Sequence, residues 1–202
     1  MDEYYVAQSH TTDPGEYGDL LANLPRDLAA IAEVTQGLIY HYMAGRAFYG
    51  WVPPTARLSE VNTRTLHDVL ATLLAKDDRP LTVARAYRDR VIGCCRDFSL
   101  LACAILRHQG RAARLRYGFA SYFSPGYWGD HVVVETWIGT RWHRFDPQLA
   151  DQTILDEMAT LSRNPDSNEL RARCATADRW QLPSSVNCFN PIIGPAFAVA
   201  VA

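Results

Sequence analysis

The sequence lacks several features that would assign it to a particular class of protein. No run of about 18 apolar residues occurs, so no segment is expected to span a membrane. The first residues form neither a basic stretch nor an apolar one, so no secretory signal is predicted and a reducing cytoplasm is the expected location. Twenty basic residues stand against 22 acidic ones, and the net charge of −2 argues against general binding to nucleic acids or to membranes.

Cysteine is scarce, and its spacing fits neither a disulfide framework nor a metal site. The five cysteines are Cys94, Cys95, Cys103, Cys174 and Cys188. Their number is odd, and no Cys-x-x-Cys pair occurs among them. Four of the six histidines, His10, His41, His67 and His108, also lack metal-ligand spacing. We therefore expect free thiols, no metal and no cofactor.

Apolar residues make up 48% of the chain, which is enough for a sizeable core in 202 residues. Apolar positions at helical spacing predict helices over residues 24–43 and 59–76. A further short helix is expected over 81–90. A loop is expected over 44–56, because that stretch contains two glycines and two prolines. The chain is therefore expected to begin with a set of helices.

The expected organisation has three parts: a helical N-terminal extension over 1–79, a core over 80–150, and a C-terminal segment over 151–202 whose structure the pattern does not define. No charged residue occurs from Trp180 to Ala202. Such an end is a buried strand, a strand that binds a partner, or the product of truncation or of a reading-frame change. The sequence leaves these readings open.

The stretch from Gly93 to Gly110 predicts a buried helix with a cysteine in its first turn. Its apolar residues form a wide face, and Gly110 stands where a C-terminal cap belongs. The positive end of a helix dipole favours negative charge, so a cysteine there is expected to ionise readily. Cys94 and Cys95 both lie at this position, whereas Cys103 is two turns further along and is expected in the core.

A β-hairpin downstream is expected to bring a histidine and an aspartate together. The strands 131–138 and 141–145 flank a two-residue turn, so paired residues have numbers that sum to 279. Asp146 then lies opposite Val133, two residues from His131 and on the same face. Diagonal neighbours are about 7–8 Å apart, which is within reach of a His–Asp hydrogen bond. His143 falls on the other face, and one extra residue in the turn would spoil this register.

Together these blocks resemble the transglutaminase-like superfamily. The match covers roughly residues 80 to 150, and its blocks occur in the family's order. Its residues are Gly93, Cys95, Arg96, Asp97 and Phe98; Leu106, Arg107, Gly110, Ala113 and Arg114; Asp130 and His131; Trp142, Asp146 and Pro147. The Gly-x-Cys-Arg-Asp spacing of the first block selects Cys95 over Cys94.

The resemblance implies an α+β fold with a papain-like core, in which an antiparallel sheet packs on the cysteine-bearing helix. It also implies a catalytic triad of Cys95, His131 and Asp146, which attacks a carboxamide or peptide carbonyl and passes a thioester to an amine. The Cys95 backbone N–H and a second, unidentified donor would bind the oxyanion. Two alternatives stay open: a peptidase or amidase with water as acceptor, and a catalytically silent domain that binds peptides or a partner protein.

Aromatic residues gather between Ser121 and Gly129, a stretch that is expected to be a loop. Tyr122, Tyr127 and Trp128 are therefore candidate substrate-binding residues, although core positions suit them equally well. The expected substrate is a protein, a peptide or a small amide, without a nucleic acid or membrane partner. The oligomeric state is left open.

Overall fold

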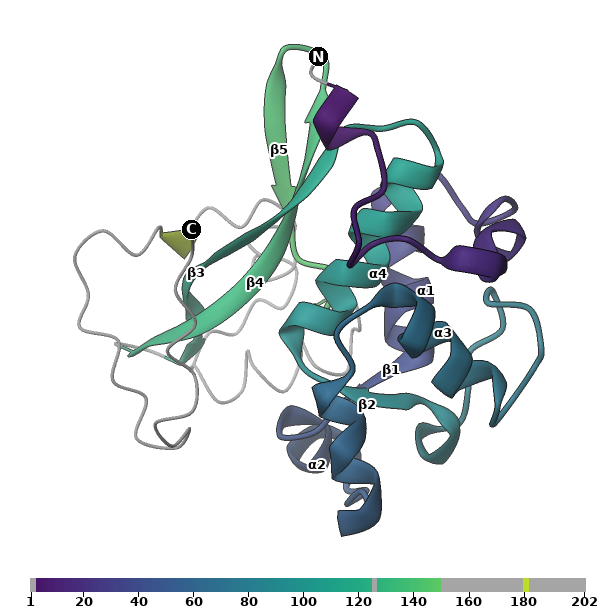
Figure 1. The fold of residues 1–202 in the computed structure, drawn as a ribbon. Helices are drawn as coiled ribbons and strands as arrows, with labels where there is room; N and C mark the ends of the chain where they lie inside the picture. Colours follow the sequence, from purple (N-terminus) through teal and green to yellow (C-terminus); the bar gives the residue numbers. More distant parts are fainter. Residues whose placement is uncertain (1–2, 125–126, 150–179, 182–202) are drawn as a thin grey trace.

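The computed structural model describes residues 3–124, 127–149 and 180–181, apart from the side chains of 47–48, 121–128 and 180–181. This part of the chain has an α+β fold in which helix α4 lies between shorter helices and an antiparallel sheet (Figure 1). The helices, including 3-10 helices labelled η, are η1 (Glu3–Tyr5), η2 (Gly15–Leu21), α1 (Leu28–Leu38), α2 (Ala44–Tyr49), η3 (Thr55–Asn62), α3 (Leu66–Leu74), η4 (Tyr87–Asp89) and α4 (Cys95–His108). The strands are β1 (Ile39–His41), β2 (Val91–Gly93), β3 (Ala113–Ser124), β4 (Tyr127–Ile138), β5 (Arg141–Phe145) and β6 (Trp180–Gln181).

The strands form two sheets. β1 and β2 pair in parallel, and the four others form an antiparallel sheet in the order β5-β4-β3-β6. In the β4–β5 hairpin Ile138 pairs with Arg141 and Val134 with Phe145, so the predicted two-residue turn and register are confirmed. Gly139 in the turn has φ +60°, a conformation that glycine adopts without steric cost.

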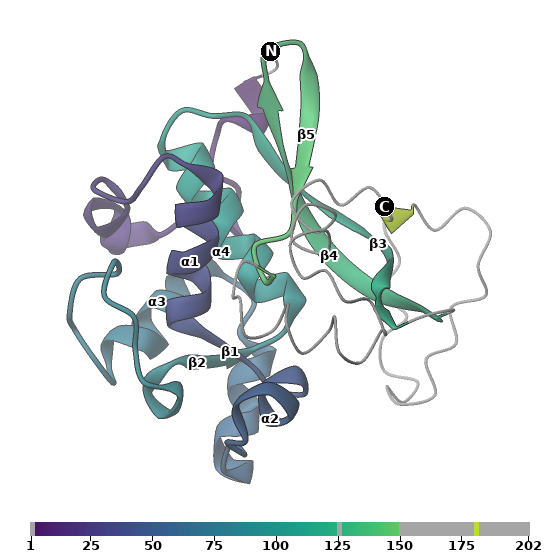
Figure 2. The same cartoon turned by 180° about the vertical axis from the view of Figure 1, so that it is seen from behind.

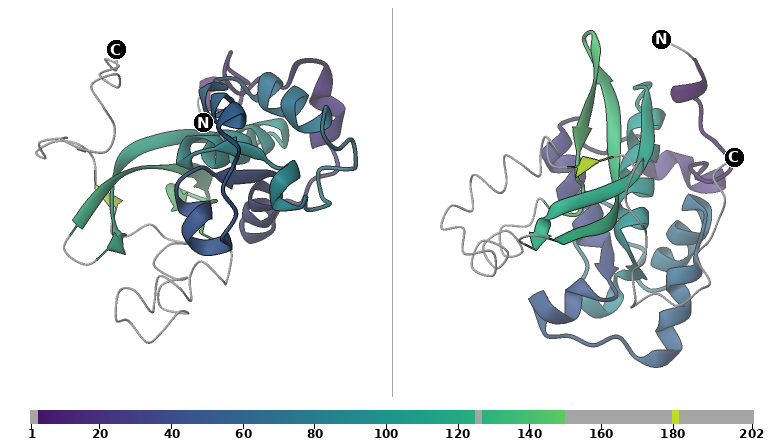
Figure 3. Two further views of the ribbon diagram at one scale, coloured as in Figure 1. Left: turned by 90° about the horizontal axis from the view of Figure 1, so that it is seen from below. Right: turned by 90° about the vertical axis from the view of Figure 1, so that its left-hand side faces the viewer.

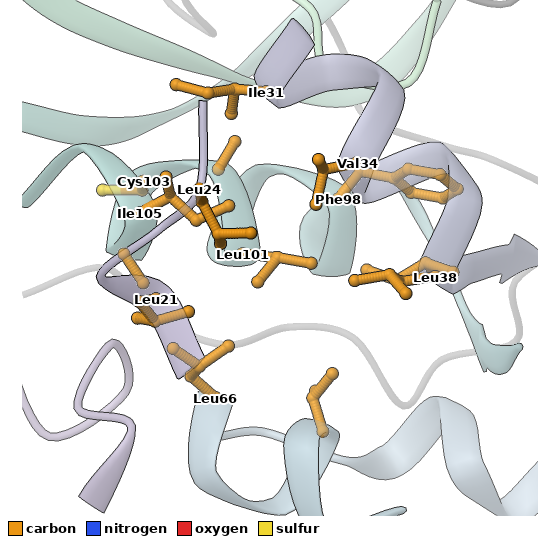
Figure 4. Packing of buried hydrophobic residues seen from close by; sticks show 14 of the residues in the cluster. Leu21, Leu24, Ile31, Val34, Leu38, Leu66, Phe98, Leu101, Cys103 and Ile105 are labelled. Carbon is orange, nitrogen blue, oxygen red and sulfur yellow. The ribbon is translucent and has the colours of Figure 1, made fainter. Parts of the chain in front are cut away.

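Helix α4 is the centre of the hydrophobic core. Seen from behind, α1 lies along it, and the close-up shows side chains of η2, α1 and α3 gathered around its apolar face (Figures 2 and 4). Leu101 is 1% exposed, and Cys103 is fully buried, as predicted. Burial raises the pKa of the Cys103 thiol to about 12, so this cysteine is an inert core residue.

The end of α4 follows the sequence prediction closely. Gly110 has φ +74°, its N–H donates to the Arg107 carbonyl, and the Arg111 N–H donates to the Leu106 carbonyl. These two bonds form a Schellman motif, which satisfies carbonyls that the helix itself leaves without partners. The chain then turns directly into β3, which packs against the helix.

The first predicted helix, 24–43, is too long at both ends. Helix α1 begins at Leu28 because the Asp27 carboxylate accepts hydrogen bonds from the Ala29 and Ala30 N–H groups and caps it. It ends at Leu38 because the next three residues pair with β2 as strand β1. Tertiary pairing therefore overrides the helical spacing at this end.

Three further predictions between α1 and α4 need correction. The loop expected over 44–56 contains the short helix α2, which ends at Gly50 with φ +68°. The helix expected over 59–76 is divided into η3 and α3, because the Thr65 hydroxyl caps α3 by accepting the Asp68 N–H. The stretch 81–90 contains only η4, since the buried Arg85 guanidinium holds four backbone carbonyls in an irregular turn.

The hairpin of β3 and β4 is longer than predicted and projects beyond the helices (Figure 3). Its strands continue to a pair between Ser124 and Tyr127, although the register shifts after Ala120. The expected loop over 121–129 is thus mostly strand. The irregular register interrupts the alternation of side chains by which a strand is predicted, which explains why a loop was expected there.

Glu135 of β4 is a buried carboxylate surrounded by guanidinium groups. It is 3% exposed and lies 2.8 Å from Arg114, 3.2 Å from Arg116 and 2.9 Å from Arg144. The three arginines come from the neighbouring strands β3 and β5, so the cluster ties three strands together.

Within the described ranges, no helix has the length and apolarity needed to cross a bilayer. Of the C-terminal segment 151–202, only β6 is described, and it pairs with Phe119 and Ala120 of β3. The remaining expectations for that segment lie outside the described residues.

Candidate active site

The N-terminus of α4 places Cys94 and Cys95 at the edge of the core. Cys94 is the N-cap residue in an extended conformation, and Cys95 is the first helical residue. The Asp97 carboxylate accepts a hydrogen bond from the Cys94 N–H at 2.8 Å and forms an ion pair with Arg96 at 2.7 Å. Arg96 also donates to the carbonyls of Val61 and Thr63, so the first turn of α4 is held against the end of η3.

Gly93 is required at the approach to this helix. A Cβ atom there would lie 2.7 Å from an Asp97 carboxylate oxygen, a contact that real Cβ atoms do not make. The glycine of the Gly-x-Cys block thus permits the Asp97 carboxylate to cap the helix. This explains physically why the residue two positions before Cys95 has no side chain.

The two thiols interact with each other, and this changes the expected electrostatics. A hydrogen bond between them lowers the pKa of Cys94; the same bond, followed by burial and the charge of Cys94, raises the pKa of Cys95 well above its ordinary value. The helix dipole was expected to favour ionisation of Cys95. In the resting arrangement Cys95 instead keeps its proton, so its ionisation requires a base.

His131 and Asp146 form a buried pair, in the register that the sequence predicted. His131 Nε2 lies 2.6 Å from Asp146 Oδ2, and the two residues are 4% and 5% exposed. The other carboxylate oxygen accepts the Gln148 N–H at 3.0 Å. Because the carboxylate accepts at Nε2, the proton of neutral His131 resides there, and Nδ1 remains the basic nitrogen. His143 pairs with Thr136 on the other face, as predicted.

Helix α1 fixes the backbone next to Asp146. The Thr35 hydroxyl and the Gln36 amide both donate to the Pro147 carbonyl, at 3.1 and 2.8 Å. Both donors are buried. The residues before 80 therefore contribute directly to the position of the aspartate.

The strand that carries His131 lies against the helix that carries Cys95. The Ser99 hydroxyl of α4 donates to the Val132 carbonyl at 2.9 Å. The backbone N–H of Val132 also lowers the pKa of Cys95, although burial and Cys94 outweigh it. The thiol thus lies beside the residue that follows His131, and the three residues predicted as a triad belong to one region of the molecule.

His41 also belongs to this region, which the sequence analysis did not anticipate. It is the last residue of β1 and pairs with Gly93, two residues before Cys95. Burial, together with the positive charge of His131, lowers its pKa to about 4, against an opposing effect of Asp146. No local sequence pattern predicts that His41 lies in this region, because the strand pairing that places it here joins segments about fifty residues apart.

The three aromatic residues predicted to bind substrate have a different backbone setting. Tyr122 lies in β3, whereas Tyr127 and Trp128 lie in β4. Their side chains lie outside the described part, so the substrate-binding role stays a prediction. Among the described residues, no group of three or more His, Cys, Asp and Glu side chains is arranged to hold a metal ion.

A cysteine at a helix start, beside a strand that carries a histidine paired with a carboxylate, is typical of papain-like cysteine enzymes. The sequence model of the transglutaminase-like superfamily matches residues 31–147, which is more than half of the chain. The chain belongs to this superfamily, and its papain-like α+β core is the fold that the superfamily implies.

Among solved structures, the chain is similar to a proposed cysteine protease from Cytophaga hutchinsonii, with 16% sequence identity and a TM-score of 0.44. The similarity covers 73% of this chain and 42% of that protein, so the chain spans less than half of its length. A search of curated proteins finds no significant match.

Proposed function

We propose that the protein is a thiol acyl-transfer enzyme that acts on carboxamide or peptide carbonyls through Cys95, His131 and Asp146. The observation that carries the proposal is the buried 2.6 Å pair between His131 and Asp146, next to the helix start that bears Cys95. A histidine and a carboxylate that are both buried and hydrogen-bonded form an oriented base. The resemblance of the sequence to the superfamily implies a triad of the same three residues.

The proposed reaction begins with transfer of the Cys95 proton to Nδ1 of His131. The sulfur attacks the substrate carbonyl, the C–S bond forms, and the carbonyl oxygen becomes an oxyanion. As this intermediate collapses, the C–N bond breaks, and the imidazolium returns its proton to the leaving amine or ammonia. The thioester is then attacked by an amine or by water, which His131 deprotonates, and the Cys95 thiol is regenerated.

Acylation by p-nitrophenyl acetate tests the proposal without knowledge of the natural substrate. We expect a burst of nitrophenolate equal to the enzyme concentration, with the acetyl group located on Cys95 by mass spectrometry. His131→Ala should slow the burst at least about 100-fold, since the base is lost. His143→Ala is the matched control, because it removes a histidine from the opposite face of the same hairpin. Acetylation of Cys94 instead, or a normal burst in His131→Ala, would overturn the proposal.

The acyl acceptor is proposed to be a primary amine, as the resemblance to transglutaminases implies. A glutamine-containing peptide with a fluorescent amine provides the test. Incorporation of the amine together with ammonia release supports transfer. Ammonia release or peptide cleavage without incorporation would assign the same residues to hydrolysis.

A further inference from the structure

His41 has a fixed protonation state. Its Nδ1 accepts the backbone N–H groups of Met43 and Ala44, both at 3.2 Å, where the chain enters α2. A nitrogen that accepts two hydrogen bonds carries no proton, so the ring proton resides on Nε2. With its pKa lowered to about 4, the ring stays neutral through the physiological range. His41 is therefore a constant Nε2–H donor.

The ring of His41 lies against the cysteine-bearing helix and within electrostatic reach of the His131–Asp146 pair. Its backbone pairs with Gly93, and the next residue, Tyr42, donates its N–H to the Gly93 carbonyl at 3.0 Å. The ring stacks against Phe98 of α4, one turn after Cys95, with centroids 6.4 Å apart. The charges of His131 and Asp146 both act on it. One side of the ring thus faces the cysteine helix, and the His131–Asp146 pair is close enough to influence it.

The Nε2–H of His41 has no acceptor among the residues that the structure describes, although the side chain is partly buried. This N–H is therefore available to a water molecule or to a bound ligand. Its orientation is fixed twice, by the bonds to Nδ1 and by ring stacking on Tyr42 at 5.5 Å. A donor of this kind is preorganised rather than mobile.

We propose that Nε2–H of His41 donates a hydrogen bond to the carbonyl oxygen of the acyl substrate and stabilises the oxyanion that forms when Cys95 attacks. The inference rests on the proposed function and supplies the second donor that acylation needs beside the Cys95 backbone N–H. A neutral donor suits this position, because it adds no positive charge close to the imidazolium that His131 becomes. His41 is then a catalytic residue.

Tyr42 is the competing donor. Burial raises its pKa, and the charges of Cys94, Cys95 and Asp130 raise it further, which places its hydroxyl within electrostatic reach of the thiols. Its ring stacks on that of His41. The two residues are distinguished by substitution, since Tyr42→Phe removes the hydroxyl and keeps the ring.

Two reactions of the same thiol test the proposal. Acylation by p-nitrophenyl acetate forms an oxyanion, whereas alkylation by iodoacetamide displaces iodide and forms none. Loss of an oxyanion donor should therefore slow acylation about 10²–10³-fold and leave alkylation of Cys95 nearly unchanged. A structural role of His41 would slow both reactions together.

The variants are chosen to preserve the start of α2. In His41→Asn the side-chain oxygen can replace Nδ1 as acceptor for residues 43 and 44, but the shorter side chain does not reach the position of Nε2. In His41→Gln the longer amide places an N–H near that position, so it should restore part of the acylation rate. Thermal unfolding of each variant reports whether the fold is intact.

The expected result is slow acylation with normal alkylation in His41→Asn, partial recovery in His41→Gln, and near-normal acylation in Tyr42→Phe. Normal acylation in His41→Asn overturns this inference alone, as does a parallel loss of both reactions. A larger acylation defect in Tyr42→Phe than in His41→Asn also overturns it, in favour of the tyrosine. A wild-type protein that is alkylated but never acylated overturns the proposed function, and this inference with it.

Discussion

Replacing Asp146 by asparagine should reverse the proton arrangement of His131. Asp146 Oδ1 accepts the Gln148 N–H, and Oδ2 faces His131 Nε2 at 2.6 Å. The Gln148 N–H requires an acceptor, so the amide oxygen of the new asparagine takes the place of Oδ1. Its NH₂ group then faces Nε2, which becomes an acceptor, and the ring proton moves to Nδ1. In that tautomer Nδ1 cannot take the proton of Cys95.

The size of the effect follows from two losses. A hydrogen bond to a charged group contributes about 1.5–3 kcal/mol, so its loss alone slows the reaction by roughly 10- to 150-fold. The wrong tautomer adds a further penalty, and the same substitution in a Ser-His-Asp protease costs about 10⁴-fold. We therefore expect acylation of Asp146→Asn to be slower by between about 10² and 10⁴.

The p-nitrophenyl acetate burst measures this rate, and Asp146→Ala is the comparison. Alanine leaves the tautomer of His131 free, so it should acylate faster than asparagine. It also deprives the Gln148 N–H of its acceptor, so it should unfold at a lower temperature. An asparagine variant that acylates within about threefold of wild type would refute the reasoning, because Asp146 would then not control the base.

Four further outcomes follow from the described contacts. Cys94→Ala removes the hydrogen bond and the charge that raise the pKa of Cys95, so that pKa should fall. Iodoacetamide should then label Cys95 faster at pH 7 to 8 than in the wild type. Slower labelling would contradict the interaction between the two thiols. Because the pKa of His41 is lowered to about 4, the unfolded chain binds a proton that the folded chain does not bind between pH 6.5 and 4. Stability should therefore decrease by about 1–3 kcal/mol as pH falls through this window, and urea titrations of His41→Asn should show a smaller decrease. Gly110→Ala forces a side chain into φ +74° and should cost about 1 kcal/mol in urea unfolding, with an unchanged midpoint as the contrary result. Glu135→Gln removes the carboxylate shared by three arginines and should cost about 3–5 kcal/mol; a loss below 1 kcal/mol would mean that the cluster is solvated.

Local patterns were sufficient to predict the centre of the molecule. The start and the glycine cap of α4 depend on residues within a few positions of each other. The same is true of the β4–β5 hairpin, where the length of one turn fixes the pairing of Val134 with Phe145. The approach of His131 to Asp146 follows from that register alone, so it could be predicted without knowledge of any distant contact.

The surroundings of the site depend on contacts that no local pattern contains. The helical spacing continues past Leu38, but β1 forms because β2 offers a parallel partner about fifty residues later. His41 enters the site only through this pairing. The interaction between Cys94 and Cys95 was also missed, because a helix-dipole argument treats each thiol separately and neglects the proton that neighbouring thiols share.

Thr35 and Gln36 donate hydrogen bonds to the Pro147 carbonyl across sequence separations of 112 and 111 residues. These long-range contacts bear on the order in which the parts of the site assemble during folding. Long loops close late, so α4 and the hairpin are expected to form before α1 meets the end of β5. A nascent chain would then expose Cys95 well before its base is locked in place. The secondary structure around Cys95 would thus form before the active site is complete. Cys95 would remain inactive until folding is nearly finished.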